Sequence, residues 1–233
     1  MGAKARALAP TATFLLVLGG CAGPASEPDG CGDLDLTGGE RALLDGTRAS
    51  LDAWRMAGPG GFELQEDCSV RTVGGMGLLW FPEELTDYRL TVEWRSAGDG
   101  NSGVFVGFPD PGDDPWVAVE HGYEIQVDPT DAPDRTTGAV YGVRGADVAA
   151  RDAALRPPGE WNTFEIVVDG DSLTVSLNGT VVNELAAAGP DLAGHVGLQN
   201  HGAADEVDFR AVVVAPLDRA GAARGPSHAD HFG

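Results

Sequence analysis

Short stretches of alternating or continuous apolar residues recur along the middle of the chain, and they predict β-strands. Each stretch is bounded by Gly, Asp, Asn or Pro, residues that favour turns. The strands are expected at residues 78–81, 88–95, 102–108, 123–127, 163–168, 173–177, 181–185, 195–199 and 207–214. Helical periodicity is weak and predicts only one short helix, within residues 147–155. Many short strands joined by regular turns are typical of an all-β sandwich or jelly roll.

One of these strands carries an unusual set of polar side chains. Apolar residues alternate there with Glu124, Gln126 and Asp128. Because successive side chains of a strand point to opposite faces, the three polar groups share one face. A solvated face would favour Thr, Lys or Ser, whereas two carboxylates and an amide suit a sheet that binds a polyol and transfers protons. This strand is therefore the first candidate for a functional site.

A second strand repeats this arrangement near the end of the domain. His195, Gly197, Gln199 and His201 share the face opposite the apolar residues. Gly197 is expected to leave room above the sheet for a ligand, and Gln199 to contact that ligand. His201 titrates near neutral pH and suits a proton shuttle, although a histidine held by backbone groups at a strand end is an equal alternative. We expect His195 to be structural.

The chain is strongly acidic, which restricts its partners. Its 233 residues include 15 Lys and Arg against 36 Asp and Glu, for a net charge of −21. Such a chain repels phosphate backbones, so we expect no nucleic-acid partner. No Gly-x-Ser-x-Gly motif and no metal-binding motif is found in the sequence, so neither a serine hydrolase nor a metal site is favoured.

The N-terminal segment resembles an export signal. Residues 1–20 combine two basic residues, a short apolar run and small residues before Cys21. The segment Leu18-Gly19-Gly20-Cys21 is similar to a bacterial lipobox, in which Cys21 is lipidated; the alternative is an ordinary cleaved signal. With the lipobox, the protein is expected to be an exported lipoprotein, anchored only by its lipid to the outer face of the cytoplasmic membrane or to the cell envelope.

The remaining chain divides into a tether, one domain and a tail. Residues 21–39 are rich in Gly, Pro, Asp and Glu and predict a flexible tether, whereas residues 215–233 predict a disordered tail. Residues 40–214 are the size of one domain. Besides Cys21 only Cys31 and Cys68 remain, and an even pair in an exported protein predicts a disulfide, with two free thiols as the alternative.

Motifs along this domain resemble those of the 3-keto-disaccharide hydrolase domain family in order and spacing. They are Leu44-Asp45-Gly46, Trp54, Gly77-Leu78-Leu79-Trp80, residues 88–94, Asn101-Ser102-Gly103, Gly122-Tyr123-Glu124-Ile125-Gln126, Gly138-Ala139-Val140-Tyr141-Gly142, Gly159-Glu160-Trp161-Asn162, Leu177-Asn178-Gly179 and Gly197-Leu198-Gln199-Asn200-His201. The resemblance implies a concanavalin A-like jelly roll of two curved antiparallel sheets with little helix. It also implies a sugar cleft on the concave sheet, and an enzyme that cleaves glycosidic bonds beside a ketone.

That activity suggests roles for the polar residues. Cleavage beside a ketone needs a base for the proton on carbon 2 and an acid for the leaving oxygen, and Glu124 is the first candidate for both. Burial and a neighbouring carboxylate such as Asp128 would raise the pKa of Glu124; the alternatives are a carboxylate that only binds hydroxyls and a structural ion pair. Gln126 suits binding. Asp128, which precedes a proline, is equally suited to a turn.

Other residues are expected to complete the cleft. Asn101 follows a Gly-rich turn and can present an amide to a sugar, with a tight turn as the alternative. Tyr141, Trp80 and Trp116 are candidate platforms, because aromatic faces suit the C–H surfaces of sugars. We expect no cofactor. Because concanavalin-like folds often hold a structural calcium, the Asp-rich loop at residues 110–114 is a candidate for one.

Three functions are compatible with these features. The first is an exported hydrolase that cleaves 3-keto-glycosides or 3-keto-disaccharides by acid–base chemistry. The second is a non-catalytic, lectin-like carbohydrate-binding module of the cell envelope with the same fold. The third is an envelope scaffold that holds another protein. Convergence of the polar residues in one cleft would favour the first two.

Overall fold

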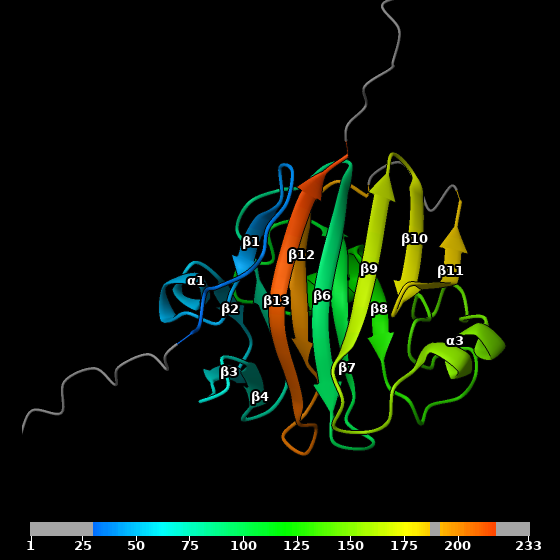
Figure 1. Cartoon of the computed structure of the whole chain (residues 1–233), viewed down its shortest axis with the longest axis horizontal. Coiled ribbons are helices and arrows are strands. Elements are labelled where there is room, and N and C mark those ends of the chain that lie inside the picture. The colour runs from blue at the N-terminus through cyan, green and yellow to red at the C-terminus, as the bar shows by residue number, and fades with distance from the viewer. Residues whose placement is uncertain (1–29, 187–191, 218–233) are drawn as a thin grey trace, which may run out of the picture.

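Two antiparallel β-sheets pack face to face in the computed structural model (Figure 1). The structure describes residues 30–186 and 192–217. The larger sheet has eight strands, in the order β11-β10-β9-β6-β13-β4-β3 with β1 paired to β13, and the smaller has five, in the order β2-β5-β12-β7-β8. The predicted all-β sandwich is thereby confirmed.

The strands of the large sheet are β1 (Arg41–Leu44), β3 (Gly61–Leu64), β4 (Val70–Val73), β6 (Tyr88–Ser96), β9 (Asn162–Asp169), β10 (Ser172–Leu177), β11 (Thr180–Leu185) and β13 (Val207–Pro216). Those of the small sheet are β2 (Arg55–Ala57), β5 (Gly77–Trp80), β7 (Ser102–Phe108), β8 (Tyr123–Val127) and β12 (His195–Asn200). The helices of the described residues are short: α1 (Arg48–Asp52), α2 (Trp116–His121) and α3 (Val148–Ala154). None of them is long and apolar enough to cross a membrane.

The apolar core fills the space between the two sheets. In β6, Leu90, Val92 and Trp94 are buried while the residues between them are more exposed. Phe164 and Ile166 alternate in the same way along β9. Burying one large apolar side chain stabilises the fold by roughly 1.5–3 kcal/mol, so the alternation decides which face of each strand packs inward.

An Asn-Gly turn fixes the register of the hairpin formed by β10 and β11. Asn178 and Gly179 connect β10 to β11 and both have positive φ angles, 49° and 83°. Asn-Gly is the pair that tolerates two such residues in a hairpin turn. The Asn178 side chain also accepts a hydrogen bond from the Thr163 backbone N–H at 2.8 Å and donates to Ala154 O at 2.8 Å. These two hydrogen bonds connect the predicted turn to β9 and to the end of α3.

The small sheet is covered on both faces at its centre, and β7 is buried along its whole length. One face joins the main core, and the other carries a second cluster of buried side chains that includes α2. This cluster consists of Ala57, Leu78, Trp80, Phe105, Phe108 and Ala118. The helix therefore covers part of the face that points away from the large sheet, and the polar side chains of β8 lie beside it.

A further segment, residues 137–141, runs along the free edge of β8. The Gln126 backbone N–H donates to Ala139 O at 2.9 Å, and the Tyr141 N–H donates to Glu124 O at 2.9 Å. These hydrogen bonds pair backbone N–H and C=O groups of β8 that would otherwise be unpaired at the edge of the sheet. They also bring Tyr141 next to Glu124.

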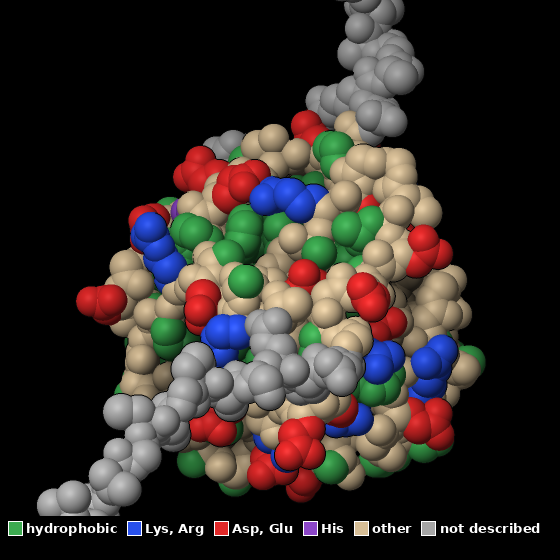
Figure 2. Space-filling view, turned by 60° about the vertical axis from the view of Figure 1, so that its left-hand side comes forward, with side chains coloured by type: hydrophobic (Ala, Val, Ile, Leu, Met, Phe, Trp, Pro, Cys, Tyr) green, Lys and Arg blue, Asp and Glu red, His purple; other side chains and the backbone are tan. Residues whose placement is uncertain are grey.

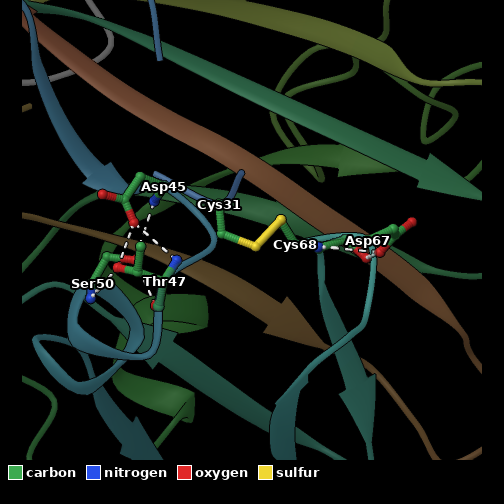
Figure 3. Close-up of a disulfide and its surroundings, with 7 residues drawn as sticks. Cys31, Asp45, Thr47, Ser50, Asp67 and Cys68 are labelled. Atoms are coloured by element: carbon green, nitrogen blue, oxygen red, sulfur yellow. Dashed lines mark hydrogen bonds between the residues drawn. A yellow bond between two sulfur atoms is a disulfide. The ribbon is translucent and has the colours of Figure 1, made fainter. Parts of the chain in front are cut away.

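The predicted disulfide joins Cys31 to Cys68, with the two Cα atoms 5.5 Å apart (Figure 3). It connects the start of the described chain to the turn before β4. Beside it, Asp45 Oδ1 accepts hydrogen bonds from the backbone N–H and the hydroxyl of Thr47, at 2.9 and 2.7 Å. Thr47 in turn caps α1. The disulfide prediction is confirmed, and the alternative of two free thiols is excluded.

Carboxylates and arginines are interspersed over the face of the molecule shown in Figure 2. On the large sheet several arginines are committed to ion pairs. The buried Asp208 carboxylate accepts from Arg71 Nε at 2.7 Å and from Arg95 Nε at 2.8 Å. Arg95 also reaches Asp67 at 2.7 Å. These ion pairs lie between β4, β6 and β13, and they hold the neighbouring strands together.

Several elements lie outside the sequence prediction. Strands β1 to β4 and helices α1 and α2 had no predicted counterpart, because each spans only three to six residues. The predicted short helix is confirmed as α3, which Asp147 caps by accepting the Ala150 N–H at 3.0 Å. Strand β13 continues past residue 214 to Pro216. The signal segment, Cys21 and residues 218–233 lie outside the described residues.

Removing the disulfide is expected to destabilise the domain without changing its fold. Replacing Cys31 and Cys68 by serine should lower the free energy of unfolding by about 2–4 kcal/mol, because the unfolded chain regains the entropy of an open loop. Urea unfolding followed by tryptophan fluorescence measures this loss. Reduced wild-type protein should match the double variant, and a double variant as stable as the oxidised protein would contradict the expectation.

Candidate active site

A cleft with a volume of about 420 Å³ lies on the outward face of the small sheet, beside α2. Five polar side chains line it: Asn101, Glu124, Gln126, Gln199 and His201. Apolar and aromatic residues complete its walls: Met76, Gly77, Leu78, Phe105, Pro115, Trp116, Val119 and Tyr141. The structure thus brings together the predicted polar residues of two strands, except for Asp128.

Glu124 occupies the floor of the cleft on β8. Its side chain is only 9% exposed and lies across the neighbouring strand β7, above Gly103. A Cβ atom added at Gly103 would lie 2.7 Å from Glu124 Cγ, closer than real Cβ contacts allow. Position 103 therefore has to be glycine for the carboxyl group to take this place.

The surroundings of Glu124 favour its neutral form. Burial raises its pKa to about 8, and a hydrogen bond from the Gln199 side chain offsets only part of that rise. Among the described residues that line the cleft there is no Lys or Arg, and Glu124 is the only carboxylate. Glu124 is consequently a carboxylic acid at neutral pH, able to donate a proton.

Asp128 does not line this cleft; of the two roles considered for it, substrate binding and a turn, the structure shows the turn. Its Oδ1 accepts the backbone N–H groups of Thr130 and Asp131, at 2.9 and 3.0 Å, and the Thr130 hydroxyl at 3.0 Å. It is not among the cleft residues and contributes nothing to the raised pKa of Glu124. Because Pro129 ends the strand, the carboxylate turns back to cap the following loop, as an Asp-Pro turn does.

The two glutamines of the cleft have buried acceptors without donors. Gln126 Nε2 donates to Asn101 Oδ1 at 3.4 Å, but the side-chain carbonyl oxygens of Gln126 and Gln199 have no partner among the described residues. A buried acceptor left unpaired costs about 1–3 kcal/mol. A hydroxyl group bound in the cleft, or the proton of Glu124 itself, would supply the missing donor.

His201 follows the end of β12 at the mouth of the cleft. Its Nδ1 lies 2.8 Å from Asp205 Oδ2, and its side chain is 52% exposed. The second oxygen, Asp205 Oδ1, is 3.1 Å from the Asn101 backbone N–H, which donates to it. The partner of His201 is therefore a carboxylate and not the backbone group considered above. Asp205 was missed because it lies in a turn, where strand periodicity gives no signal.

Two exposed aromatic side chains line the cleft. Trp116 on α2 is 54% exposed and Tyr141 on the edge segment is 42% exposed. Both suit stacking on a sugar face. Trp80, also expected as a platform, is buried in the cluster beneath α2, with its ring 5.0 Å from that of His195. That expectation is wrong because Trp80 is buried among apolar side chains, and the Arg55 guanidinium lies over its ring, 5.4 Å from the centroid.

Two other residues of the same face are structural. His195 Nδ1 lies 3.0 Å from Phe81 O in the buried interior, in agreement with the structural role expected for it. Gly197 does not leave room for a ligand: an added Cβ would meet Leu78 Cδ1 at 2.8 Å and Phe108 Cζ at 3.2 Å. The space above Gly197 is filled by the apolar cluster, which corrects the prediction.

The Asp-rich loop considered for calcium uses its carboxylates within its own turns. Asp110 Oδ1 accepts the Gly112 N–H at 2.8 Å, and Asp114 Oδ1 accepts the Trp116 N–H at 3.0 Å. Over residues 30–186 and 192–217, no three His, Cys, Asp or Glu side chains are grouped so as to hold a metal ion. The donor set of the cleft, two glutamines, one buried acid and one histidine, suits hydrogen bonding and proton transfer.

Comparison with known proteins identifies related sequences and folds. The model of a family described as "3-keto-alpha-glucoside-1,2-lyase-like domain" matches residues 39–215. Two solved structures from Parabacteroides distasonis, both provisionally described as glycosyl hydrolases, are similar in fold. The first has a TM-score of 0.64 and 19% identity, and the match covers 77% of this chain and 94% of that one. The second has a TM-score of 0.62 and 22% identity, over 76% and 99%.

A carbohydrate-binding module from Bacillus subtilis is also similar, with a TM-score of 0.50 and 14% identity over 70% of this chain and 95% of that one. No curated protein matches the chain in sequence. At these identities the structural neighbours establish the jelly-roll fold, whereas the family match covers nearly the whole domain.

Enlarging Gly103 is expected to displace Glu124. Gly103→Ala should lower the free energy of unfolding by about 1–3 kcal/mol, because the new methyl group overlaps the buried acid. Gly98→Ala is the matched control, since a Cβ there meets nothing within 4 Å. In both variants alanine lowers the conformational entropy of the unfolded chain by the same amount. The difference between their free energies of unfolding in urea therefore reports the clash with Glu124 alone. Equal stability of the two variants would contradict the packing described.

Glu124→Gln should change how stability depends on pH. The pKa of Glu124 rises from 4.5 to about 8 on folding, so between these values the native state holds a proton that the unfolded state has lost. The wild-type free energy of unfolding therefore falls across this window, by up to about 5 kcal/mol from this group, and levels off above it. Glu124→Gln has no such proton to lose, so its free energy of unfolding should not show this fall.

Denaturant unfolding at pH 5 and pH 9 measures this difference. The stability of Glu124→Gln relative to wild type should increase by several kcal/mol from pH 5 to pH 9. Glu165→Gln, on the exposed side of β9, is the control for a carboxylate in solvent. A constant difference between Glu124→Gln and wild type at both pH values would show that Glu124 is not held as a neutral acid.

Proposed function

The chain belongs to the family of 3-keto-alpha-glucoside-1,2-lyase-like domains, and from this premise we propose that it cleaves the glycosidic bond of 3-keto-glycosides by acid–base elimination in the cleft. Family and fold support, more generally, a protein that binds or cleaves carbohydrate. The specific reaction is supported by the chemistry of the side chains in the cleft.

One observation carries the proposal: a single buried carboxylic acid lines the cleft together with a single histidine. Conventional glycosidases use two carboxyl groups about 5–10 Å apart. Within the described part of the cleft lining, Glu124 has no second carboxylate for that mechanism, and His201 is the other titratable group suited to proton transfer. A neutral acid and an imidazole suit a reaction that removes one proton and delivers another.

Elimination beside a ketone requires this pair of proton transfers. The carbonyl at carbon 3 acidifies the hydrogen on carbon 2, and removing that proton gives an enediolate. The enediolate collapses to a double bond between carbons 1 and 2, and expels the oxygen on carbon 1, which takes a proton as it leaves. Water added across that double bond would complete hydrolysis. Each positioned acid or base contributes about 10²–10⁴-fold to such a rate.

The remaining cleft residues suit an uncharged, hydroxyl-rich substrate. The unpaired carbonyl oxygens of Gln126 and Gln199 can accept hydroxyl hydrogen bonds. Trp116 and Tyr141 offer aromatic faces on the rim, where a sugar ring can stack. The lack of Lys and Arg among the described lining residues disfavours phosphorylated or carboxylated sugars.

The second candidate is a lectin-like module that binds carbohydrate without cleaving it. The half-exposed aromatic rim favours it, and so does the fold shared with a carbohydrate-binding module. A third possibility, an envelope scaffold, accounts for neither the buried acid nor the polar cleft floor.

We also propose that the protein is exported and anchored at the cell envelope through a lipid on Cys21. The signal-like residues 1–20 support this, although they lie outside the described residues. The Cys31–Cys68 disulfide also supports it, because disulfides persist in oxidising compartments outside the cytoplasm.

Incubation of the purified protein with a 3-keto-disaccharide and with the unoxidised disaccharide tests the proposed reaction. Only the ketone should be cleaved, and Glu124→Gln should lower kcat by about 10²–10⁴-fold. Glu165→Gln, remote from the cleft, should retain wild-type activity. Binding of both sugars without turnover would favour the lectin-like module, and cleavage of the unoxidised sugar would contradict elimination in favour of a conventional glycosidase.

A further inference from the structure

The carboxylate of Asp205 links two parts of the cleft that come from distant segments. One of its oxygens, Oδ2, lies 2.8 Å from His201 Nδ1, and the other, Oδ1, accepts the Asn101 backbone N–H at 3.1 Å. Asn101 immediately precedes β7, whereas His201 and Asp205 lie in the turn between β12 and β13. A single carboxylate therefore contacts both the His201 ring at the cleft mouth and the backbone of Asn101, the residue just before β7.

Asp205 is itself fixed by hydrogen bonds of its backbone. Its carbonyl oxygen accepts the Thr72 hydroxyl of β4 at 2.7 Å, and its N–H donates to Gly202 O at 3.1 Å. Thr72 Oγ1 also accepts the Val207 N–H at 3.0 Å, so β4 holds the end of the turn that contains Asp205. The Asp205 side chain is 21% exposed. Its carboxylate is thus held in a defined position.

This contact decides which nitrogen of His201 carries the proton. An ionised carboxylate only accepts hydrogen bonds, so Nδ1 has to be the donor. In a neutral imidazole the other nitrogen, Nε2, then holds the lone pair. His201 lines the cleft, so it offers a proton acceptor there, whereas the carboxyl group of Glu124 offers a proton.

We propose that Asp205 is the positioning residue that makes His201 the base of the reaction and leaves Glu124 as the acid. The catalytic assignment rests on the proposed function, whereas the tautomer of His201 does not. In the reaction, the proton on carbon 2 moves to His201 Nε2 and its electron pair forms the enediolate. Collapse of the enediolate expels the oxygen on carbon 1, which takes the proton of Glu124. The resulting imidazolium is stabilised by Asp205, and proton exchange with solvent restores both groups.

The tautomer is measured first, in the wild-type protein and without substrate. Long-range ¹H–¹⁵N NMR of the histidine rings, assigned with His201→Gln, distinguishes the two ring nitrogens. At a pH where His201 is neutral, the expected result is a proton on Nδ1 and a lone pair on Nε2. A wild-type ring protonated on Nε2 would overturn the proposal without any further variant.

Asp205→Asn then tests whether the carboxylate sets that state. The amide retains an oxygen for the Asn101 N–H but can donate to Nδ1, so His201 should change to the Nε2-protonated tautomer. With a 3-keto-disaccharide, kcat should fall by about 10²–10⁴-fold with little change in KM. Asp205→Glu should recover the wild-type tautomer and part of the activity. If Asp205 only stabilised the fold, Asp205→Asn would not change the tautomer of His201, and Asp205→Glu would not recover the tautomer and activity.

Asp45→Asn is the matched control, because Asp45 also accepts a backbone N–H within a turn but lies beside the disulfide. It should leave the His201 tautomer and kcat unchanged. An Asp205→Asn protein with wild-type tautomer and kcat would overturn the proposal. If wild-type protein cleaved no 3-keto-glycoside, the proposed function would fail, while the ring spectra of the same samples would still confirm or overturn the positioning role of Asp205.

Discussion

The site depends on one constraint, the removal of the Glu124 carboxyl group from water without a cation to compensate. A buried carboxylate without a cation is costly, so the group stays protonated. Position 103 provides the space, since any side chain there would overlap Glu124. The Gln199 amide provides a hydrogen bond. Side chains of helix α2 and Tyr141 of the edge segment also line the cleft around Glu124.

The same constraint explains why the small sheet is built as it is. Its outward face carries a cluster of apolar side chains under α2, and the cleft lies at the border of that cluster. An apolar surrounding raises the pKa of Glu124 more than a solvated sheet face would. The histidine at the cleft mouth is placed differently, half exposed and held by Asp205. Two titratable groups in contrasting surroundings are what a pair of opposite proton transfers requires.

The sequence was sufficient for the strands from β5 to β13 and for the polar face. It was insufficient for the short strands β1 to β4, and for features that depend on contacts between distant segments. Period-two alternation located β6 to β13, and the shared face of Glu124 and Gln126 followed from it. Asp128 continues the same alternation, but the proline after it redirects its carboxylate into a loop. Trp80 and Gly197 were misjudged because nothing in the local pattern shows that Arg55 lies over Trp80, or that Leu78 and Phe108 fill the space above Gly197. Asp205 was missed because it lies in a turn, and its side-chain partners Asn101 and His201 lie just before β7 and just after β12.

The account of the site would be tested most directly by the titration of Glu124 itself. With ¹³C-labelled glutamate, the side-chain carboxyl resonance of Glu124 can be identified by its loss in Glu124→Gln and followed from pH 3 to pH 10. We expect a midpoint near pH 8, since burial raises the pKa of Glu124 to about 8. A midpoint near 4.5, the ordinary value for glutamate, would mean that the carboxyl group is ionised at neutral pH and cannot be the proton donor of the cleft.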